Sequence, residues 1–180
     1  MSLVDVATQF IARKYEGKYR PGIGIPYSTH LFGVARILKN AGYRDEVVIA
    51  GLLHDSLEDE MVTTEEIQKQ FGQDILQFVK VATELEKNTS WHERKSFVIQ
   101  QIQYKTDEQL AITLAEKINN IKAITMEVSQ VGEKMWDSFK APKEKQEWYY
   151  RSIIEEVTIH HPNARLLDKL KNAVDKLFVR

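Results

Sequence analysis

Four acidic residues and a histidine follow an apolar run in the stretch VIAGLLHDSLEDE, residues 48–60. Asp55 precedes Glu58 by three positions and Asp59 by four, so a continuing helix would place these carboxylates on one face with His54 beside them. Carboxylates at the C-terminal end of a helix meet the negative end of its dipole and repel one another. A divalent cation would replace this repulsion with ligation and could activate water for hydrolysis. The spacing therefore predicts a metal site.

Two other segments carry residues that could complete such a site. His30 follows the sequence PYST, and Glu116 and Asn120 lie four residues apart, beside an apolar stripe. That stripe consists of Leu110, Leu114, Ile118 and Ile121. Imidazole and carboxylate ligands from separate helices suit a hard or borderline ion such as manganese, magnesium, iron or zinc. The chain has no cysteine, which excludes disulfides, thiolate ligands and cysteine nucleophiles.

The elements that must position these residues are predicted to be helices. Only 8 glycines and 4 prolines interrupt the chain, and apolar residues recur at intervals of three and four. We expect helices over 3–15, from 28 or 29 to about 40, from 45 into the acidic cluster, and over 64–71, 91–104, 107–125, 143–159 and 164–178. The fold class is therefore predicted to be all-α.

Helix ends are indicated by capping residues. Capping boxes begin at Thr63, Ser90 and Thr106. Further N-caps are predicted at Ser28 or Thr29, at Asp45 and at Asn163, and Gly42 is predicted to end a helix in the left-handed conformation. Residues 17–27 form a loop rich in glycine and proline, and residues 126–142 are predicted to be a polar, irregular loop.

Composition favours a single domain over residues 1–180. The chain is 43% hydrophobic with a net charge of −1, which gives no sign of a nucleic acid polymer or a membrane as partner. No signal-peptide pattern and no apolar run of about 18 residues occurs, so we expect a cytoplasmic protein.

The order of these residues resembles the signature of the HD-domain metal-dependent phosphohydrolases, a histidine followed by His-Asp and a later acid. The matching stretches are Arg20 to His30, AGLLHDSLED at 50–59, TEEI to FG at 64–72, VATELEK with ERK at 81–95, and LAEKINNIK at 114–122. Together they are similar to the small stand-alone guanosine-3′,5′-bis(diphosphate) 3′-pyrophosphohydrolases, over about residues 5–160.

This resemblance implies one HD-domain bundle of about eight to ten helices, and a role for each matching residue. The implied metal ligands are His30, His54, Asp55 and Glu116, and the implied catalytic pair is Glu58 and Asp59. Arg20 would contact substrate phosphate and Asn120 the nucleoside, while Tyr149 or Tyr150 would line the pocket. The implied metal is Mn²⁺, with Mg²⁺, Fe²⁺ or Zn²⁺ as alternatives, and the implied partners are a small nucleotide substrate and a second copy in a homodimer. The reaction would release the 3′-pyrophosphate of (p)ppGpp by attack of metal-activated water.

Two positions depart from the family pattern. Glu116 stands where the family has aspartate, and Pro21 stands where it has a lysine after the arginine. The loss of positive charge at position 21 favours a first alternative, a phosphohydrolase acting on another nucleotide or phosphate monoester. The change at position 116 favours a second alternative, a catalytically inert HD module that binds a nucleotide and regulates a partner.

Overall fold

The computed structural model describes residues 1–20, 24–83 and 89–178. Pro21 and the segment 84–88 lie outside the described residues. The chain divides into two compact units, Met1–Glu84 and Leu85–Arg180, and each is described by itself. In the described ranges the regular structure consists of nine α-helices and two 3₁₀ helices, with one isolated bridge between Tyr19 and Pro26. The predicted all-α class is confirmed; the single domain over 1–180 stays a prediction.

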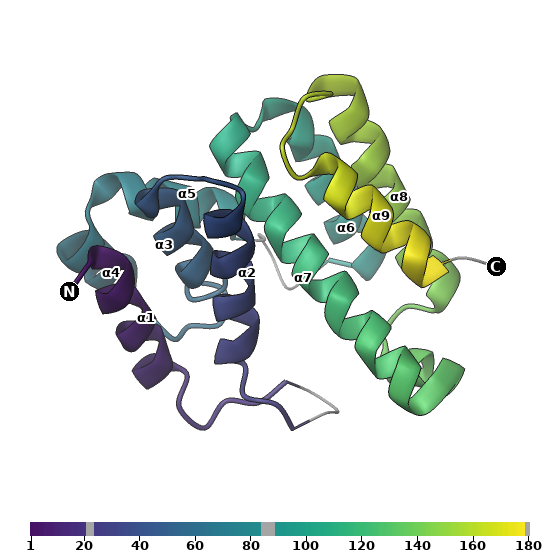
Figure 1. Ribbon diagram of the computed structural model, residues 1–180, viewed down its shortest axis with the longest axis horizontal. Coiled ribbons are helices and arrows are strands. Elements are labelled where there is room, and N and C mark those ends of the chain that lie inside the picture. Colours follow the sequence, from purple (N-terminus) through teal and green to yellow (C-terminus); the bar gives the residue numbers. More distant parts are fainter. Residues whose placement is uncertain (21–23, 84–88, 179–180) are drawn as a thin grey trace. The chain divides into compact units, whose positions relative to one another are not determined.

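The first unit is built around α3, the most buried of its helices. Its helices are α1 (Leu3–Lys14), α2 (Ser28–Asn40), α3 (Asp45–Leu53), α4 (Thr64–Phe71) and α5 (Gln73–Ala82). All residues of α3 from Val47 to Leu53 are buried, because α1, α2 and α5 pack around this helix (Figure 1). A helix that is apolar on every side must lie in a core. The end of α3 is thereby fixed inside the unit.

The second unit is built around the long helix α7. Its elements are α6 (Trp91–Gln101), η1 (Ile102–Tyr104), α7 (Asp107–Val131), η2 (Gly132–Ser138), α8 (Lys143–His160) and α9 (Leu167–Phe178). Helix α7 packs against α9 and η2, while α8 packs against α6, η1 and α9 (Figure 1). The predicted stripe of α7 is buried, with at most 1% exposure at Leu110, Leu114, Ile118 and Ile121.

Four helix ends follow the predicted capping signals. The boxes at Thr63, Ser90 and Thr106 are formed, each with reciprocal hydrogen bonds to the third helical residue. Gly42 has φ 77°, as expected of a residue that ends a helix in the left-handed region. Such caps need only a few neighbouring residues, which is why the sequence predicts them.

Three N-cap predictions were wrong. Tyr27, with helical φ and ψ and no side-chain cap bond, precedes α2, because a tight turn from Pro26 leads directly into that helix. Arg44 is extended and caps α3, so Asp45 is already the first helical residue. Asn163 caps nothing, because turns with backbone bonds from Ala164 and Leu167 delay α9 to Leu167.

The predicted loop over 126–142 was also wrong. Helix α7 continues to Val131, and η2 follows directly. The added turns of α7 up to Val131 are half-buried or exposed, whereas Met135 and Trp136 of η2 are buried in the same unit. The helix ends only at Gly132, whose φ of 73° suits glycine. Tertiary burial outweighed the polar composition in η2, while α7 continues to Val131 without further buried side chains.

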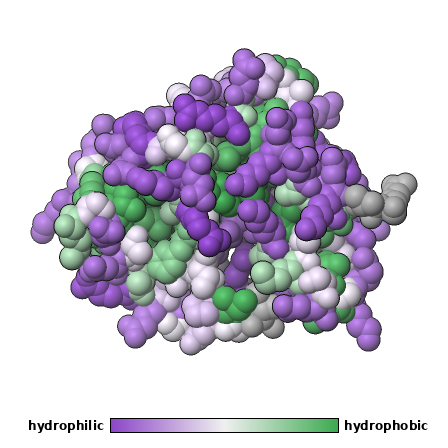
Figure 2. Space-filling model, viewed as in Figure 1, coloured by the Kyte–Doolittle hydropathy of each residue, from purple (hydrophilic) through white to green (hydrophobic). Residues whose placement is uncertain are grey.

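The visible surface is largely hydrophilic. On the face shown in Figure 2, hydrophobic residues appear in separate groups among hydrophilic ones. Within the described ranges, no helix combines the length and the apolar character that a bilayer crossing requires.

Candidate metal centre

Close packing of α2 against α3 brings His30 and His54 together. His30 lies in the first turn of α2, and His54 follows the last residue of α3. Three residues before His54, Gly51 faces α2 so closely that a Cβ atom would lie 2.4 Å from Leu38 Cδ1 and 3.4 Å from Val34 Cγ1. Glycine therefore permits an approach of the two helices that any larger residue would obstruct.

Two imidazole nitrogens and one carboxylate converge at this helix contact. His30 Nε2 lies 3.3 Å from His54 Nε2 and 3.6 Å from Asp55 Oδ2. His54 Nε2 lies 3.2 Å from Asp55 Oδ1. These three residues offer ligand atoms that all lie within 4.8 Å of one another. Both histidines are buried, and the Asp55 side chain is 20% exposed.

This arrangement fits a divalent ion. The Nδ1–H group of His54 donates to the carbonyl oxygen of Gly51 at 2.8 Å, and a carbonyl can only accept, so a neutral ring keeps its Nε2 lone pair toward His30 and Asp55. Atoms that bind one ion at about 2.1 Å lie about 3.0 Å apart at right angles and about 3.4 Å apart at the tetrahedral angle. The observed separations are close to these values. His30, His54 and Asp55 could therefore hold a metal through two imidazoles and a carboxylate.

Two stacked tyrosines support the carboxylates of the site. Tyr27 donates a hydrogen bond to Asp55 Oδ2 at 2.8 Å, and Tyr15 donates one to Asp59 Oδ2 at 2.9 Å. The two rings stack with centroids 5.5 Å apart, and Tyr27 meets the His30 ring edge-on at 5.8 Å. Burial and the nearby carboxylates raise the pKa of both tyrosines, with Asp59 acting most on Tyr15 and Asp55 most on Tyr27. Both hydroxyls therefore remain protonated donors.

The acidic residues lie in turns, and the prediction of a continuing helix was wrong. Helix α3 ends at Leu53, and residues 54–60 form turns in which the Asp59 amide donates to the Asp55 carbonyl at 2.8 Å. Glu60, the last residue of these turns, adopts φ 57°, in the left-handed region that a continuing helix cannot use. Glu58 and Asp59 are both half-buried in this turn.

Asp59 also forms an ion pair with a lysine of the loop that follows α1. Lys18 Nζ lies 2.8 Å from Asp59 Oδ1. The same ammonium lies 5.3 Å from the Tyr15 ring centre and 5.0 Å from that of Tyr27. Arg20 follows two residues later, half-buried, and its amide donates to the Ile25 carbonyl at 2.9 Å.

The remaining predicted residues belong to the second unit. Lys117 Nζ bonds both carboxylate oxygens of Glu116, at 2.8 and 2.9 Å, and Asn120 Nδ2 donates to Glu116 Oε1 at 3.2 Å. The predicted proximity of Glu116 and Asn120 is therefore observed. Lys117 is 3% exposed, so this carboxylate compensates a buried positive charge.

Aromatic and cationic side chains gather on α8 and its neighbours. Tyr149 and Tyr150 are both buried, at 3% and 4% exposure. Lys95 Nζ lies 5.0 Å from the centre of the Tyr149 ring, and Lys117 Nζ lies 5.5 Å from it. Burial lowers the pKa of Lys105, and repulsion from Lys117 lowers it further. The ring of Tyr149 is therefore in contact with both Lys95 and Lys117.

Sequence comparison assigns the family. The family model described as HD domain matches residues 7–144, more than half of the chain. The chain belongs to the HD domain family. The residues that match this HD-domain model include His30, His54 and Asp55, whose side chains converge in the first unit.

Individual proteins are also similar to this HD-domain chain. Guanosine-3′,5′-bis(diphosphate) 3′-pyrophosphohydrolase MESH1 of Homo sapiens is 36% identical over 119 residues, which cover 64% of this chain and 66% of the human protein. The alignment thus spans about two thirds of either protein. A crystal structure from Listeria monocytogenes has a TM-score of 0.77 and 34% identity, covering 84% of this chain and 99% of its own.

A further solved structure shares the fold at lower identity. It belongs to a metazoan ortholog of SpoT described as hydrolyzing ppGpp and playing a role in starvation responses. It matches with a TM-score of 0.74 and 23% identity, covering 96% of this HD-domain chain and 95% of the other.

Sequence reasoning missed three residues that hold the acids of this HD-domain chain. Tyr15 and Lys18 lie outside the matching stretches, and Lys117 lies within LAEKINNIK but carries no implied role there. Tyr15 does carry a signal, because it follows Ala7 and Ile11 at intervals of four on the buried side of α1. Lys117 lies seven residues after Leu110, within the apolar stripe of α7, where a cation requires a partner. Lys18 has no such signal.

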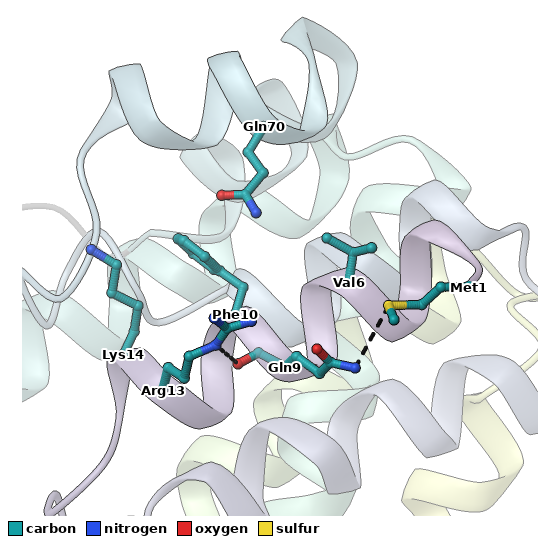
Figure 3. A pocket seen from close by; sticks show the side chains of 7 residues that line it. All are labelled: Met1, Val6, Gln9, Phe10, Arg13, Lys14 and Gln70. Atoms are coloured by element: carbon teal, nitrogen blue, oxygen red, sulfur yellow. Dashed lines mark hydrogen bonds between the residues drawn. The ribbon is translucent and has the colours of Figure 1, made fainter.

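A separate depression lies in the first unit between α1 and α4 (Figure 3). Its volume is about 440 Å³. Its lining consists of Met1, Val6, Gln9, Phe10, Arg13, Lys14 and Gln70. This lining includes no histidine or carboxylate among the described residues, so it offers none of the ligand types gathered at His30, His54 and Asp55.

Proposed function

We propose that this HD-domain chain is a metal-dependent phosphohydrolase that removes the 3′-pyrophosphate of a (p)ppGpp-type alarmone. The observation that carries the proposal is the convergence of His30, His54 and Asp55 within 4.8 Å at the contact of α2 and α3. The name of the human relative, a guanosine-3′,5′-bis(diphosphate) 3′-pyrophosphohydrolase, supports the choice of substrate.

The metal would be held by His30, His54 and Asp55, and Glu116 is proposed as the fourth ligand. We propose Mn²⁺ as the ion. When bound, a divalent ion supplies Lewis acidity and makes water a nucleophile near neutral pH. The Gly51 carbonyl orients His54, and the Tyr27 hydroxyl orients Asp55, so both ligands are already directed toward one point.

Glu58 and Asp59 are proposed as the catalytic pair, which orients the attacking water and accepts its proton. Water adds to the phosphorus that carries the ribose 3′ oxygen, and the bond between them breaks. Pyrophosphate leaves, and the 3′ oxygen gains a proton. Both carboxylates lie in the turn that follows Asp55, which places them near its carboxylate along the chain.

Substrate recognition is proposed for Arg20, Asn120 and Tyr149. A guanidinium binds phosphate through two parallel hydrogen bonds and stabilises the charge that develops during attack. Asn120 would contact the nucleoside. The ring of Tyr149, with the Lys95 and Lys117 ammonium groups near it, would line the pocket.

The test is a release assay with purified protein and Mn²⁺. The substrates are ppGpp, guanosine 3′,5′-bisphosphate, other pyrophosphorylated nucleotides and ordinary monophosphates. Asp55→Ala removes a proposed ligand, and Asp45→Ala is the matched control because it removes only an exposed carboxylate that pairs with Lys39 at 2.7 Å. We expect pyrophosphate from ppGpp with the wild type and with Asp45→Ala, and none with Asp55→Ala.

Other results would select the alternatives. Release of orthophosphate from monophosphates would favour a phosphohydrolase of another ester, as Pro21 suggests by its lack of charge. No turnover of any substrate with Mn²⁺ demonstrably bound would favour an inert nucleotide-binding module. The same module would be favoured if Glu116 stayed paired with Lys117 and did not bind the metal. The homodimer and the cytoplasmic location remain predictions from the sequence.

A further inference from the structure

We propose that Lys18 is a positioning residue that anchors Asp59 and the stem carrying Arg20 in one arrangement. The stem consists of residues 18–20 and 25–27. This inference rests on the proposed function, because Asp59 and Arg20 are its proposed catalytic and phosphate-binding residues. Nothing in the resemblance assigns a role to Lys18.

The ammonium group of Lys18 is held on three sides. It lies 2.8 Å from Asp59 Oδ1, 5.0 Å from the Tyr27 ring centre and 5.3 Å from the Tyr15 ring centre. The two rings are stacked, and Tyr15 bonds the other oxygen of Asp59. Both oxygens of Asp59 are therefore engaged by donors from one short stretch of the chain, which restricts the rotation of the carboxylate.

The backbone of Lys18 closes the stem. Its carbonyl accepts from the Tyr27 amide at 2.9 Å, and the Arg20 amide donates to the Ile25 carbonyl at 2.9 Å. An isolated antiparallel bridge joins Tyr19 and Pro26. Two backbone bonds and one bridge are a weak closure by themselves, because a short two-stranded hairpin is marginal in water. The side chain of Lys18 adds the contact that ties this stem to Asp59.

The anchor also links the stem to the proposed metal ligands. Tyr27, at the end of the stem, donates to Asp55 and meets the His30 ring edge-on. Lys18 contacts the Tyr27 ring, so removing the ammonium loosens the Asp59 and Tyr27 contacts together. A shift of about 1 Å in a positioned group can cost about 100-fold in rate.

The experiment compares Lys18→Met with Lys14→Met and Lys18→Arg. Methionine keeps much of the apolar part of the lysine side chain and removes its charge. Lys14 is a matched control, because it also pairs with a carboxylate, Glu66 at 2.6 Å, lies 5.5 Å from the Phe10 ring and has a similar 33% exposure, against 30% for Lys18. Amide hydrogen exchange of the stem and steady-state kinetics on ppGpp are measured for all variants.

We expect the Tyr27 and Arg20 amides to exchange about fivefold faster in Lys18→Met, with no change in Lys14→Met. We expect kcat to fall about 10- to 100-fold in Lys18→Met, with Lys18→Arg keeping most of the wild-type value. A purely structural role would lower the melting temperature and leave kcat of the folded fraction unchanged.

The outcomes separate this inference from the proposed function. Unchanged stem exchange in Lys18→Met overturns the anchor, whatever the activity. Faster exchange with an unchanged kcat also overturns it as a positioning residue. If the wild type releases no pyrophosphate from ppGpp, the proposed substrate is wrong. Faster stem exchange in Lys18→Met would still support the anchor in that case.

Discussion

The Nε2 atoms of His30 and His54 lie 3.3 Å apart, although the two residues are 24 positions apart in the chain. Both rings are buried, and the Asp55 carboxylate adjoins both nitrogens. Two neutral imidazole nitrogens that face one another repel through their lone pairs unless a proton or a cation lies between them. The arrangement therefore favours an occupant of positive charge.

Removing His54 should abolish metal-dependent stabilisation. With Mn²⁺ at about 100 times its dissociation constant, the wild type should gain about 2.7 kcal/mol, or about 5–10 °C in melting temperature. His54→Ala should show almost none of this gain, whereas His160→Ala, which removes an exposed histidine paired with Glu156, should keep it. Thermal unfolding with and without Mn²⁺ measures the difference. An undiminished Mn²⁺ shift in His54→Ala would show that the ion binds elsewhere.

Adding a methyl group at Gly51 should push α2 and α3 apart. The new Cβ would lie 2.4 Å from Cδ1 of the fully buried Leu38. We expect Gly51→Ala to cost about 1–3 kcal/mol of unfolding free energy, despite the better helix propensity of alanine, and to weaken Mn²⁺ binding. Denaturant unfolding and metal titration measure both effects.

A double mutant provides the control for Gly51. Leu38→Ala alone should also destabilise, by about 2–5 kcal/mol, because it leaves a cavity. The added methyl at position 51 fills part of that space, so the double mutant should be more stable than the sum of the single effects. Additive effects would mean that α2 and α3 do not meet at Gly51.

The sequence predicts those parts of the molecule that depend on neighbours along the chain. The boxes at Thr63, Ser90 and Thr106 need only a few successive residues. The order of residues 132–138 depends instead on burial of Met135 and Trp136, to which a polar local composition gives no clue. Tertiary burial decides such segments.

The candidate site also has a part that the sequence predicts and a part that depends on tertiary packing. His30, His54 and Asp55 belong to a motif, and the structure brings their side chains together. Among the partners of the acids, Tyr27 and Lys117 lie in the matching stretches, whereas Tyr15 and Lys18 lie outside them. Lys18 contacts Asp59 only because of how the loop after α1 packs, whereas Lys117 pairs with its chain neighbour Glu116 at a buried position of α7. A charged side chain in a loop is usually solvated, so its sequence gives no reason to expect otherwise.

Buried tyrosines should make the fold sensitive to alkaline pH. Burial and neighbouring carboxylates raise the pKa of Tyr15 and Tyr27 above the ordinary value of about 10. Above pH of about 10 the unfolded chain loses these protons while the native state keeps them, so the free energy of unfolding falls as pH rises. Each tyrosine contributes a slope of up to about 1.4 kcal/mol per pH unit, and nothing below pH of about 9.

Phenylalanine variants should remove this slope. Tyr15→Phe and Tyr27→Phe should each reduce the alkaline fall in unfolding free energy by the contribution of one tyrosine. Both variants also lose a hydrogen bond worth about 1 kcal/mol at neutral pH. Tyr104→Phe is the control, because that ring is 73% exposed. Urea unfolding between pH 8 and 11.5 measures the slope. If Tyr104→Phe flattened it as much as Tyr27→Phe, the decline would arise from general charge repulsion.

Neutralising Glu116 should destabilise the second unit through Lys117. The Lys117 ammonium, whose side chain is 4% exposed, bonds both oxygens of Glu116. Glu116→Gln removes the charge that compensates it, at a cost of about 1–3 kcal/mol. The matched control is Glu133→Gln, since Lys143 also bonds both oxygens of Glu133 but that carboxylate is 69% exposed. We expect less than about 1 kcal/mol there.

A second substitution identifies the buried cation as the cause. If Glu116→Gln destabilises because Lys117 loses its compensating charge, adding Lys117→Met should restore much of the stability, because an apolar side chain then occupies the buried position. Denaturant unfolding of the two single variants and the double variant measures this coupling. If Glu116→Gln were as stable as Glu133→Gln, the stability of the fold would not depend on the pairing of Lys117 with Glu116. The wild-type Glu116 carboxylate could then bind a metal ion at no cost in unfolding free energy.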